Sequence, residues 1–139
     1  MARVKIQFPD SHLFETNLKV CIDHINYGNH MGNDRFLSFA GEARLRFLKS
    51  LKQDEMNFYG SSLIMSDAEI SYKAQVYHGD SIKVELAAKP VNNKSFDFLY
   101  RFSNQNNTVV SLVKTGMVYF DYDANRVCNG PEEWLRQLV

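Results

Sequence analysis

The chain has 139 residues, in which 16 lysines and arginines balance 16 aspartates and glutamates. This length suits one domain that buries roughly two thirds of its unfolded surface, so we expect a single domain over residues 1–139. The balanced charge argues against nucleic acid and against a membrane surface as partners. No apolar run approaches the ~18 residues of a membrane span. Cys21 and Cys128 lack CxxC spacing, which favours a reduced cytoplasmic protein.

Two segments near the N-terminus have the alternation of strands. Residues 4–8 predict a short edge strand or arm, which ends at Pro9 and Asp10. Residues 14–24 predict a longer strand, with one face formed by Leu18, Val20, Ile22 and His24.

The longest helical pattern follows a polar loop at residues 25–32. It begins at Asn33 or Asp34, both common N-cap residues, and reaches Leu51. Five apolar residues recur at three- and four-residue steps: Phe36, Ala40, Ala43, Phe47 and Leu51. Four more widen the apolar arc: Leu37, Phe39, Leu45 and Leu48. So broad an apolar arc is typical of a helix that a sheet wraps.

Four strand-like segments follow, at residues 62–72, 80–89, 95–103 and 109–122. In the first, one side is formed by Ile64, Ala68, Ile70 and Tyr72. Turn sequences at residues 78–80, 92–94 and 104–107 predict antiparallel hairpins, and hence a meander of four long strands. Pro131 opens a last short helix over residues 132–138. The expected fold class is α+β, with a long central helix wrapped by a curved antiparallel β-sheet.

Residues 25–48, INYGNHMGNDRFLSFAGEARLRFL, resemble the signature of hotdog-fold acyl-CoA thioesterases, the hydroxybenzoyl-CoA and long-chain acyl-CoA class. That signature runs D-x-D-x-x-G-H-V-N-N-x-x-Y-L and continues into the helix with E-A-R. Residues 30–33 fill the H-V-N-N positions, 36–37 the Y-L positions and 42–44 the E-A-R positions. Residues 70–73 and 77–81 resemble the family's I-x-Y strand and G-D turn, so the resemblance covers almost the whole chain.

The resemblance implies an enzyme that cleaves an acyl-CoA or acyl-carrier-protein thioester to a free acid and a thiol, without a cofactor. It implies a homodimer or a dimer of dimers, with sites between subunits and CoA entering beside the helix N-terminus. The family's first acid falls on His24 and its second on Asn26. Asn26 cannot act as a carboxylate base or nucleophile, so the resemblance does not imply the family's simple aspartate mechanism for this chain.

Four residues are candidates for catalysis. The backbone N–H of Asn33 is placed by the resemblance to stabilise an oxyanion, a role compatible with N-capping. His30 is the candidate general base, with a reference pKa of about 6.5, although a loop histidine can also be structural. Glu42 either orients His30 or only pairs with Arg46. Asn26 either holds the water or the carbonyl, or forms an Asx turn.

The candidates for substrate binding are Tyr27, Gly28, Gly32, Phe36 and Asp67. Gly32 would allow close backbone approach. Asp67 either approaches the site from the sheet or from a partner subunit, or lies on the solvent face. The candidates for nucleotide phosphates are Lys73, Lys89, Arg101 and Lys114.

Two other groups of residues carry weaker signals. No compact metal-ligand spacing joins the polar residues of the loop region, so we expect no metal at Asp23, His24, His30 and Asp34. An aromatic row predicts core or an acyl-chain wall rather than a nucleic-acid stacking surface: Phe96, Phe98, Tyr100 and Phe102.

Two alternative functions remain open. A hotdog dehydratase or hydratase acting on hydroxyacyl thioesters also pairs a loop histidine with a helix carboxylate, as His30 and Glu42 could. The Pro-Gly-rich helix entrance of those enzymes is missing here. The other alternative is a non-catalytic module that binds acyl thioesters, which the absence of the family's aspartate supports. Fold alone does not separate these functions.

Overall fold

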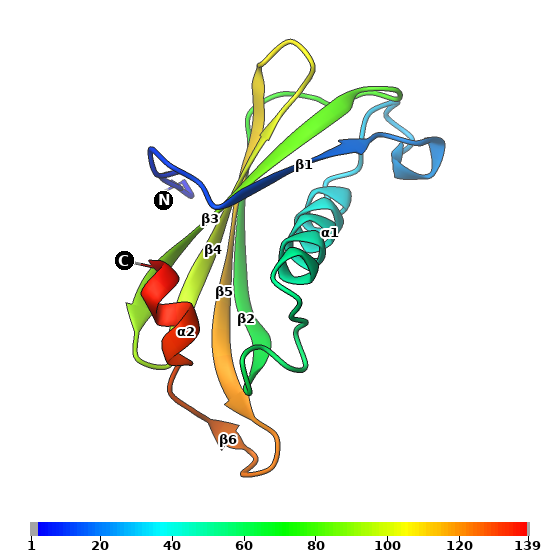
Figure 1. Ribbon diagram of the computed structural model, residues 1–139. Helices are drawn as coiled ribbons and strands as arrows, with labels where there is room; N and C mark the ends of the chain where they lie inside the picture. Colours follow the sequence, from blue (N-terminus) through cyan, green and yellow to red (C-terminus); the bar gives the residue numbers. More distant parts are fainter. Residues whose placement is uncertain (1–2, 139) are drawn as a thin grey trace.

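Six strands and two α-helices make up the computed structural model, which describes residues 3–138 (Figure 1). The strands are β1 Phe14–Lys19, β2 Ser62–Tyr72, β3 Ser81–Asn92, β4 Ser95–Ser103, β5 Val109–Asp121 and β6 Arg126–Val127. The helices are α1 Arg35–Ser50 and α2 Glu132–Leu135, with 3-10 turns at η1 Ile22–His24 and η2 Arg136–Leu138. The strands form one sheet in the order β1-β3-β4-β5-β2, with β6 beside β5. Every pairing is antiparallel, which confirms the predicted antiparallel sheet.

The expected four-strand meander is only partly correct. β3, β4 and β5 pair in succession, whereas β2 pairs with β5 at the edge opposite β1. The prediction that residues 78–80 close a hairpin between β2 and β3 is therefore wrong. Gly79 has a φ of 86° and donates its N–H to the Val20 carbonyl. This turn therefore holds the segment after β2 against the end of β1.

A β-bulge also changes the predicted faces of β2. The register of β2 shifts between Met65 and Asp67. Ile64 lies opposite Val118 and Ile70 opposite Val113, and these partners are an odd number of positions apart on β5. Because side chains alternate along a strand, Ile64 and Ile70 lie on opposite faces of the sheet. The prediction that they share one face is wrong.

The helix α1 packs its apolar side against the sheet. Its buried residues are Phe36, Phe39, Ala40, Ala43, Phe47 and Leu48. Phe36 stacks on Phe102 of β4 with ring centroids 5.8 Å apart, and Phe47 meets Phe98 edge-on. At 16 residues α1 is shorter than the predicted helix. Its N-cap residue is Asp34, one of the two predicted, although no side-chain cap hydrogen bond forms, and Leu51 is its C-cap residue.

The first long strand ends earlier than the alternation predicts. β1 stops at Lys19, and residues 22–24 form the turn η1 instead of continuing the strand. The Cys21 N–H donates to Nδ1 of His24 at 2.8 Å, and the His24 ring meets Phe39 edge-on. These two contacts stabilise a turn where periodicity alone predicts a strand.

The two ends of the chain compare differently with the expected elements. Of the two predictions for residues 4–8, the arm is correct and the edge strand is not, and the guanidinium of Arg101 lies 4.5 Å from the centre of the Phe8 ring. At the other end, the predicted helix over 132–138 divides into α2 and the 3-10 turn η2. The short strand β6 was not predicted.

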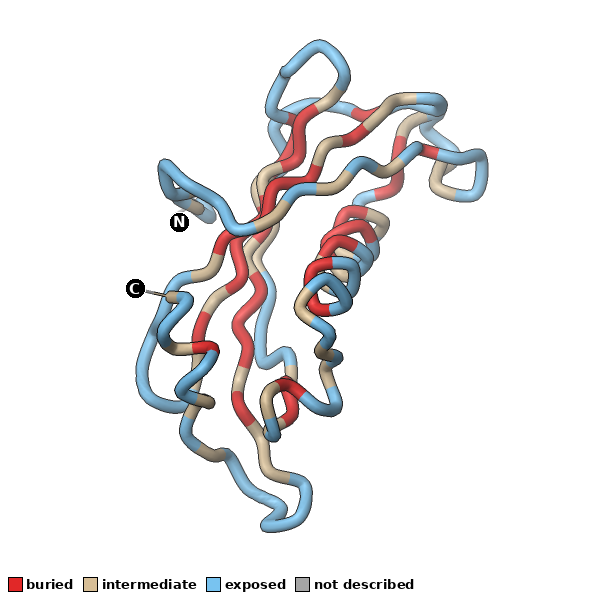
Figure 2. Tube along the Cα trace, in the orientation of Figure 1, coloured by how far each residue is buried: buried red, intermediate tan, exposed pale blue. Residues whose placement is uncertain are grey.

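The core lies between the sheet and the two helices (Figure 2). All four members of the aromatic row on β4 have no exposed surface, and this confirms that they are core: Phe96, Phe98, Tyr100 and Phe102. Trp134 of α2 is equally buried and packs on Phe96 and Phe58. Neither α1 nor α2 has the length and apolar character that a membrane-crossing helix requires.

Candidate functional site

The loop before α1 is a closed, hydrogen-bonded turn. Ile25 and Met31 form an isolated antiparallel bridge. Inside it, the Asn26 N–H donates to the His30 carbonyl at 2.9 Å, and the Asn29 N–H donates to the Asn26 carbonyl at 3.1 Å. Asn29 has a φ of 67°, a left-handed conformation that asparagine adopts more readily than most residues. The loop is therefore held in shape by its own backbone.

Asn26, Gly28 and His30 lie together within this turn. Oδ1 of Asn26 accepts the N–H of Gly28 at 2.8 Å, which is the Asx turn considered from the sequence. A Cβ on Gly28 would lie 3.1 Å from Nε2 of His30 and 3.2 Å from Oδ1 of Asn26. The missing side chain at position 28 therefore leaves room for the half-buried His30 ring.

The other ring nitrogen of His30 has a backbone partner. Nδ1 lies 3.2 Å from the carbonyl oxygen of Met31. When Nδ1 carries the proton and donates it to this carbonyl, Nε2 is left with a lone pair. That tautomer is the one a general base needs.

The backbone around Asn33 is anchored on both sides. The Met31 N–H donates to the Val76 carbonyl at 2.7 Å, and the Gly32 N–H donates to the His24 carbonyl at 3.0 Å. The Arg35 N–H donates a hydrogen bond to the Gly32 carbonyl at 3.0 Å. Within residues 3–138, no acceptor meets the backbone N–H of Asn33. Asn33 is an exposed residue just before the N-cap residue of α1, so its N–H is available to an external acceptor near the positive end of the helix.

A cavity of about 420 Å³ lies where this loop, the start of α1 and the end of β2 meet. Its lining residues are His30, Met31, Asn33, Phe36, Tyr72, Lys73, Ala74, Gln75 and Val76. The structure thus brings three predicted site residues, His30, Asn33 and Phe36, into one cavity. Asn26, Gly28 and the buried Gly32 do not line this cavity, although position 28 lies beside Nε2 of His30.

Three other predicted residues lie away from this cavity. Glu42 accepts a hydrogen bond from Nε of Arg46 at 2.7 Å, and Arg46 also bonds Thr16 of β1. Tyr27 is fully exposed at the loop tip. Asp67 lies beside the bulge of β2 and pairs with Lys114. None of them lines the His30 cavity.

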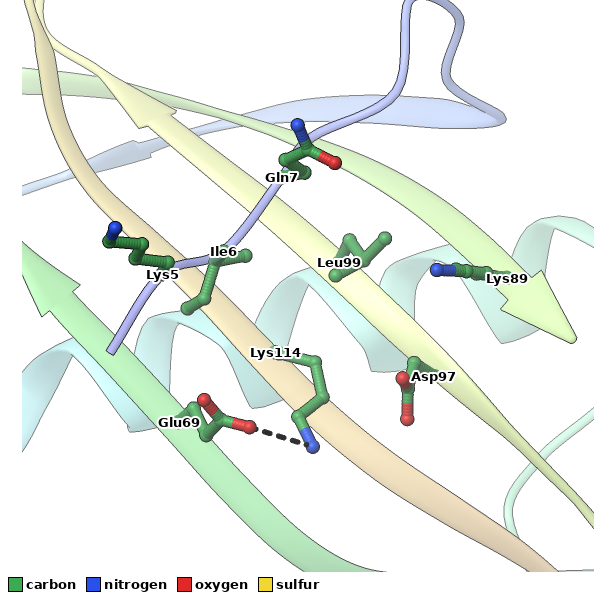
Figure 3. Close-up of a pocket in the computed structure, with 8 residues that line it drawn as sticks. All are labelled: Lys5, Ile6, Gln7, Glu69, Lys89, Asp97, Leu99 and Lys114. Carbon is green, nitrogen blue, oxygen red and sulfur yellow. Dashed lines mark ion pairs between the residues drawn. The ribbon is translucent and has the colours of Figure 1, made fainter. Parts of the chain in front are cut away.

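A second cavity, of about 440 Å³, opens on the face of the sheet opposite α1 (Figure 3). The arm at residues 5–7 borders it together with five residues of the sheet: Glu69, Lys89, Asp97, Leu99 and Lys114. Lys114 pairs with Glu69 and Asp67 at 3.2 Å each. Burial alone would lower the pKa of Lys114, but these carboxylates raise it above the usual lysine value. Among the charged residues that line this cavity, Lys114 and Glu69 are the pair joined by an ion pair.

The four basic candidates therefore have different surroundings. Arg101 donates two hydrogen bonds to the buried carboxylate of Glu85, and this ion pair lowers the pKa of Glu85. Lys89 and Lys114 line the cavity on the outer face. Lys73 lines the His30 cavity, and the described residues place no carboxylate within 4.0 Å of it.

Two groups of side chains bring three possible metal ligands within 4.8 Å of one another. One comprises Cys21, Asp23 and His24, and the other His12, Glu15 and Glu85. Nδ1 of His24 already accepts the Cys21 N–H. Neither group includes His30 or Asp34, the other residues weighed from the sequence.

The sequence did not single out Tyr72 as a site residue. Its hydroxyl donates to the carbonyl of Asn33 at 2.9 Å, and its ring meets Phe36 edge-on at 5.2 Å. Val76 was also missed, although its carbonyl holds the Met31 amide. The sequence signals at Tyr72 are the strand alternation and the I-x-Y match, and neither of them assigns it a role in the site.

The chain is similar to known proteins in its sequence pattern and in its fold. A family model described as Thioesterase-like superfamily matches residues 20–138. A search of curated proteins found no match. Among solved structures, a 1,4-dihydroxy-2-naphthoyl-CoA thioesterase from Synechocystis is 19% identical, with a TM-score of 0.81 over 90% of this chain and 94% of the other.

Two Staphylococcus aureus structures are similar to the chain at the same level. One, solved in complex with CoA, is 17% identical, with a TM-score of 0.79 over 96% of this chain and 85% of the other. The other, a DHNA-CoA thioesterase, is 13% identical, with a TM-score of 0.76 over 88% and 85%. At such low identity these structures establish the shared fold.

Proposed function

Because this chain belongs to the thioesterase-like superfamily, we propose that it hydrolyses an acyl-CoA thioester in the His30 cavity. The observation that carries the proposal is that His30 and Asn33 line the same cavity. His30 offers a ring nitrogen, and Asn33 offers a backbone N–H that no described residue accepts. The arrangement fits the hotdog fold, in which the sheet curves around the main helix. CoA bound to one similar structure supports the same class of substrate.

The Asn33 N–H is proposed to bind the thioester carbonyl oxygen. Attack on the carbonyl carbon places negative charge on that oxygen, and a donor fixed in advance stabilises the charge. The N-terminus of α1 adds the positive end of the helix dipole. Gly32 and Arg35 anchor the backbone on either side of this donor.

His30 is proposed to move the proton. Nε2 takes a proton from water as the water oxygen bonds to the carbonyl carbon. The tetrahedral intermediate then breaks its C–S bond, and His30 returns the proton to the departing CoA sulfur. The products are a carboxylic acid and a thiol. Asn26 cannot take the proton, and its Oδ1 supports the Gly28 turn beside the ring.

The direct test is thiol release from a panel of aromatic, short-chain and long-chain acyl-CoAs. The proposal expects release of CoA in step with free acid on at least one ester. Binding without release would favour the non-catalytic module. Hydration of an enoyl-CoA without thiol release would favour the hydratase. The pairing of Glu42 with Arg46 speaks against the hydratase, because the Glu42 carboxylate is bound to Arg46 and not to His30.

Lys73 is proposed to contact the phosphates of CoA. Replacing it with alanine removes one exposed charge at the cavity, so we expect KM to rise roughly three- to tenfold with kcat nearly unchanged. The difference should shrink at high salt because the charge is exposed. The matched control is Lys89→Ala, on the opposite face of the sheet, which should leave KM unchanged. Equal KM values for the Lys73 variant and the parent would remove this residue from the site.

The chain is proposed to form a homodimer in the cytoplasm. Within residues 3–138, β2 pairs with β5 on one side and its other edge has no partner. An unpaired edge of this length commonly joins another strand, and exposed Met65 and Tyr72 lie on it. The two cysteines lack CxxC spacing, which favours a reducing compartment. Light scattering should give twice the 16.1 kDa of one chain; a mass of one chain would contradict the dimer.

A further inference from the structure

Tyr72 connects the edge strand to the first turn of α1. It is the last residue of β2, and its hydroxyl donates to the carbonyl oxygen of Asn33 at 2.9 Å. The same ring meets the Phe36 ring edge-on, with an interplanar angle of 86°. One side chain therefore holds a backbone carbonyl and packs on an aromatic ring within the same turn.

The carbonyl that Tyr72 holds is next to the proposed oxyanion donor. The peptide on the N-terminal side of Asn33 is fixed by the Gly32 carbonyl, which accepts the Arg35 N–H at 3.0 Å. The peptide on the C-terminal side carries the Asn33 carbonyl, to which Tyr72 donates. Peptide units are rigid planes, so the two dihedrals of Asn33 are set by the orientation of these two planes. Both planes are held, the second by a residue 39 positions away.

The tyrosine hydroxyl remains a donor under ordinary conditions. Partial burial and the nearby Asp34 carboxylate raise the pKa of Tyr72 above the usual tyrosine value. The hydroxyl therefore keeps its proton at neutral and mildly alkaline pH. The ring lines the cavity with Asn33 and Phe36, so the contact lies at the site itself.

We propose that Tyr72 is a positioning residue, which sets the direction of the Asn33 N–H through its hydrogen bond to the Asn33 carbonyl. This inference rests on the proposed thioesterase function. An oxyanion donor accelerates the reaction only when it is aimed at the position of the developing charge. A small displacement of such a group can cost up to about a hundredfold in rate. Tyr72 does not touch the proton carrier, so its effect should be confined to stabilisation of the charge.

The test is Tyr72→Phe, which removes the hydroxyl and keeps the ring on Phe36. We expect kcat to fall roughly ten- to hundredfold. The affinity for a non-hydrolysable CoA thioether and the melting temperature should stay at the parent values. The pH at half-maximal kcat should also stay unchanged, because His30 is untouched. The matched control is Tyr122→Phe, at an exposed tyrosine outside the cavity, with unchanged kcat.

The outcomes separate this inference from the proposed function. If the parent protein hydrolyses a thioester and Tyr72→Phe has the same kcat, the positioning role is wrong and the function stands. If the variant loses melting temperature and thioether affinity together, Tyr72 has only a structural role and the inference is also wrong. If the parent hydrolyses no thioester in the panel, the proposed function is wrong, and the positioning role of Tyr72, which rests on it, is wrong as well.

Discussion

His30→Ala should lower kcat by about a hundred- to ten-thousandfold, the range that a general acid–base group contributes. The substitution removes Nε2, the only group in the proposed scheme that both accepts and returns a proton. KM should change little, because the carbonyl donor and Lys73 remain in place. The measurement is thiol release at saturating substrate.

The control for this experiment is His78→Ala, at an exposed histidine in the turn after β2. His78 is not among the residues that line the His30 cavity, so kcat should stay at the parent value. A His30 variant that keeps parental turnover would exclude His30 as the proton carrier. Circular dichroism of both variants should match the parent, because neither ring is fully buried.

Trp134→Ala should destabilise the fold by about 3–5 kcal/mol, as expected for removal of a large buried aromatic side chain. Trp134 has no exposed surface, and its ring lies 5.1 to 6.1 Å from four aromatic rings. They belong to Phe47, Phe58, Phe96 and Phe98. The expected loss is a large part of the 5–15 kcal/mol that typically stabilises a domain. Urea denaturation followed by circular dichroism measures it.

The matched control for the core is Tyr122→Ala, which truncates an aromatic side chain that is 53% exposed. Surface substitutions of this kind usually change stability by no more than about 0.5 kcal/mol. A loss below about 1 kcal/mol in Trp134→Ala would show that α2 does not close the core. The cavity around His30 involves none of these rings, so activity per folded molecule should be retained.

The part of the site that sequence could predict is the part formed by neighbours in the chain. His30, Asn33 and Phe36 lie within seven positions, on a turn and the helix that follows it, and the structure places all three at one cavity. Glu42 has a partner four residues away, and an i,i+4 pair forms readily on a helix surface. The structure has this local pair with Arg46.

The remaining parts depended on contacts between distant segments. Tyr72 and Val76 reach the site because β2 crosses to the far edge of the sheet, and the turn sequence at residues 78–80 did not predict that crossing. The faces of β2 were mispredicted because the bulge between Met65 and Asp67 interrupts the alternation. Alternation assigns His24 to a strand, because alternation does not reveal the hydrogen bond from the Cys21 N–H to the His24 ring. That hydrogen bond stabilises a turn in place of the strand.

The most direct test of the central claim is a crystal structure of the protein with a non-hydrolysable acyl-CoA thioether that retains a carbonyl group. The account predicts the carbonyl oxygen about 2.7–3.1 Å from the backbone nitrogen of Asn33, with Nε2 of His30 facing the carbonyl carbon. The CoA phosphates should lie near Lys73. Binding of the analogue in the cavity around Lys114, on the other face of the sheet, would contradict the account. A carbonyl directed away from Asn33 would contradict it equally.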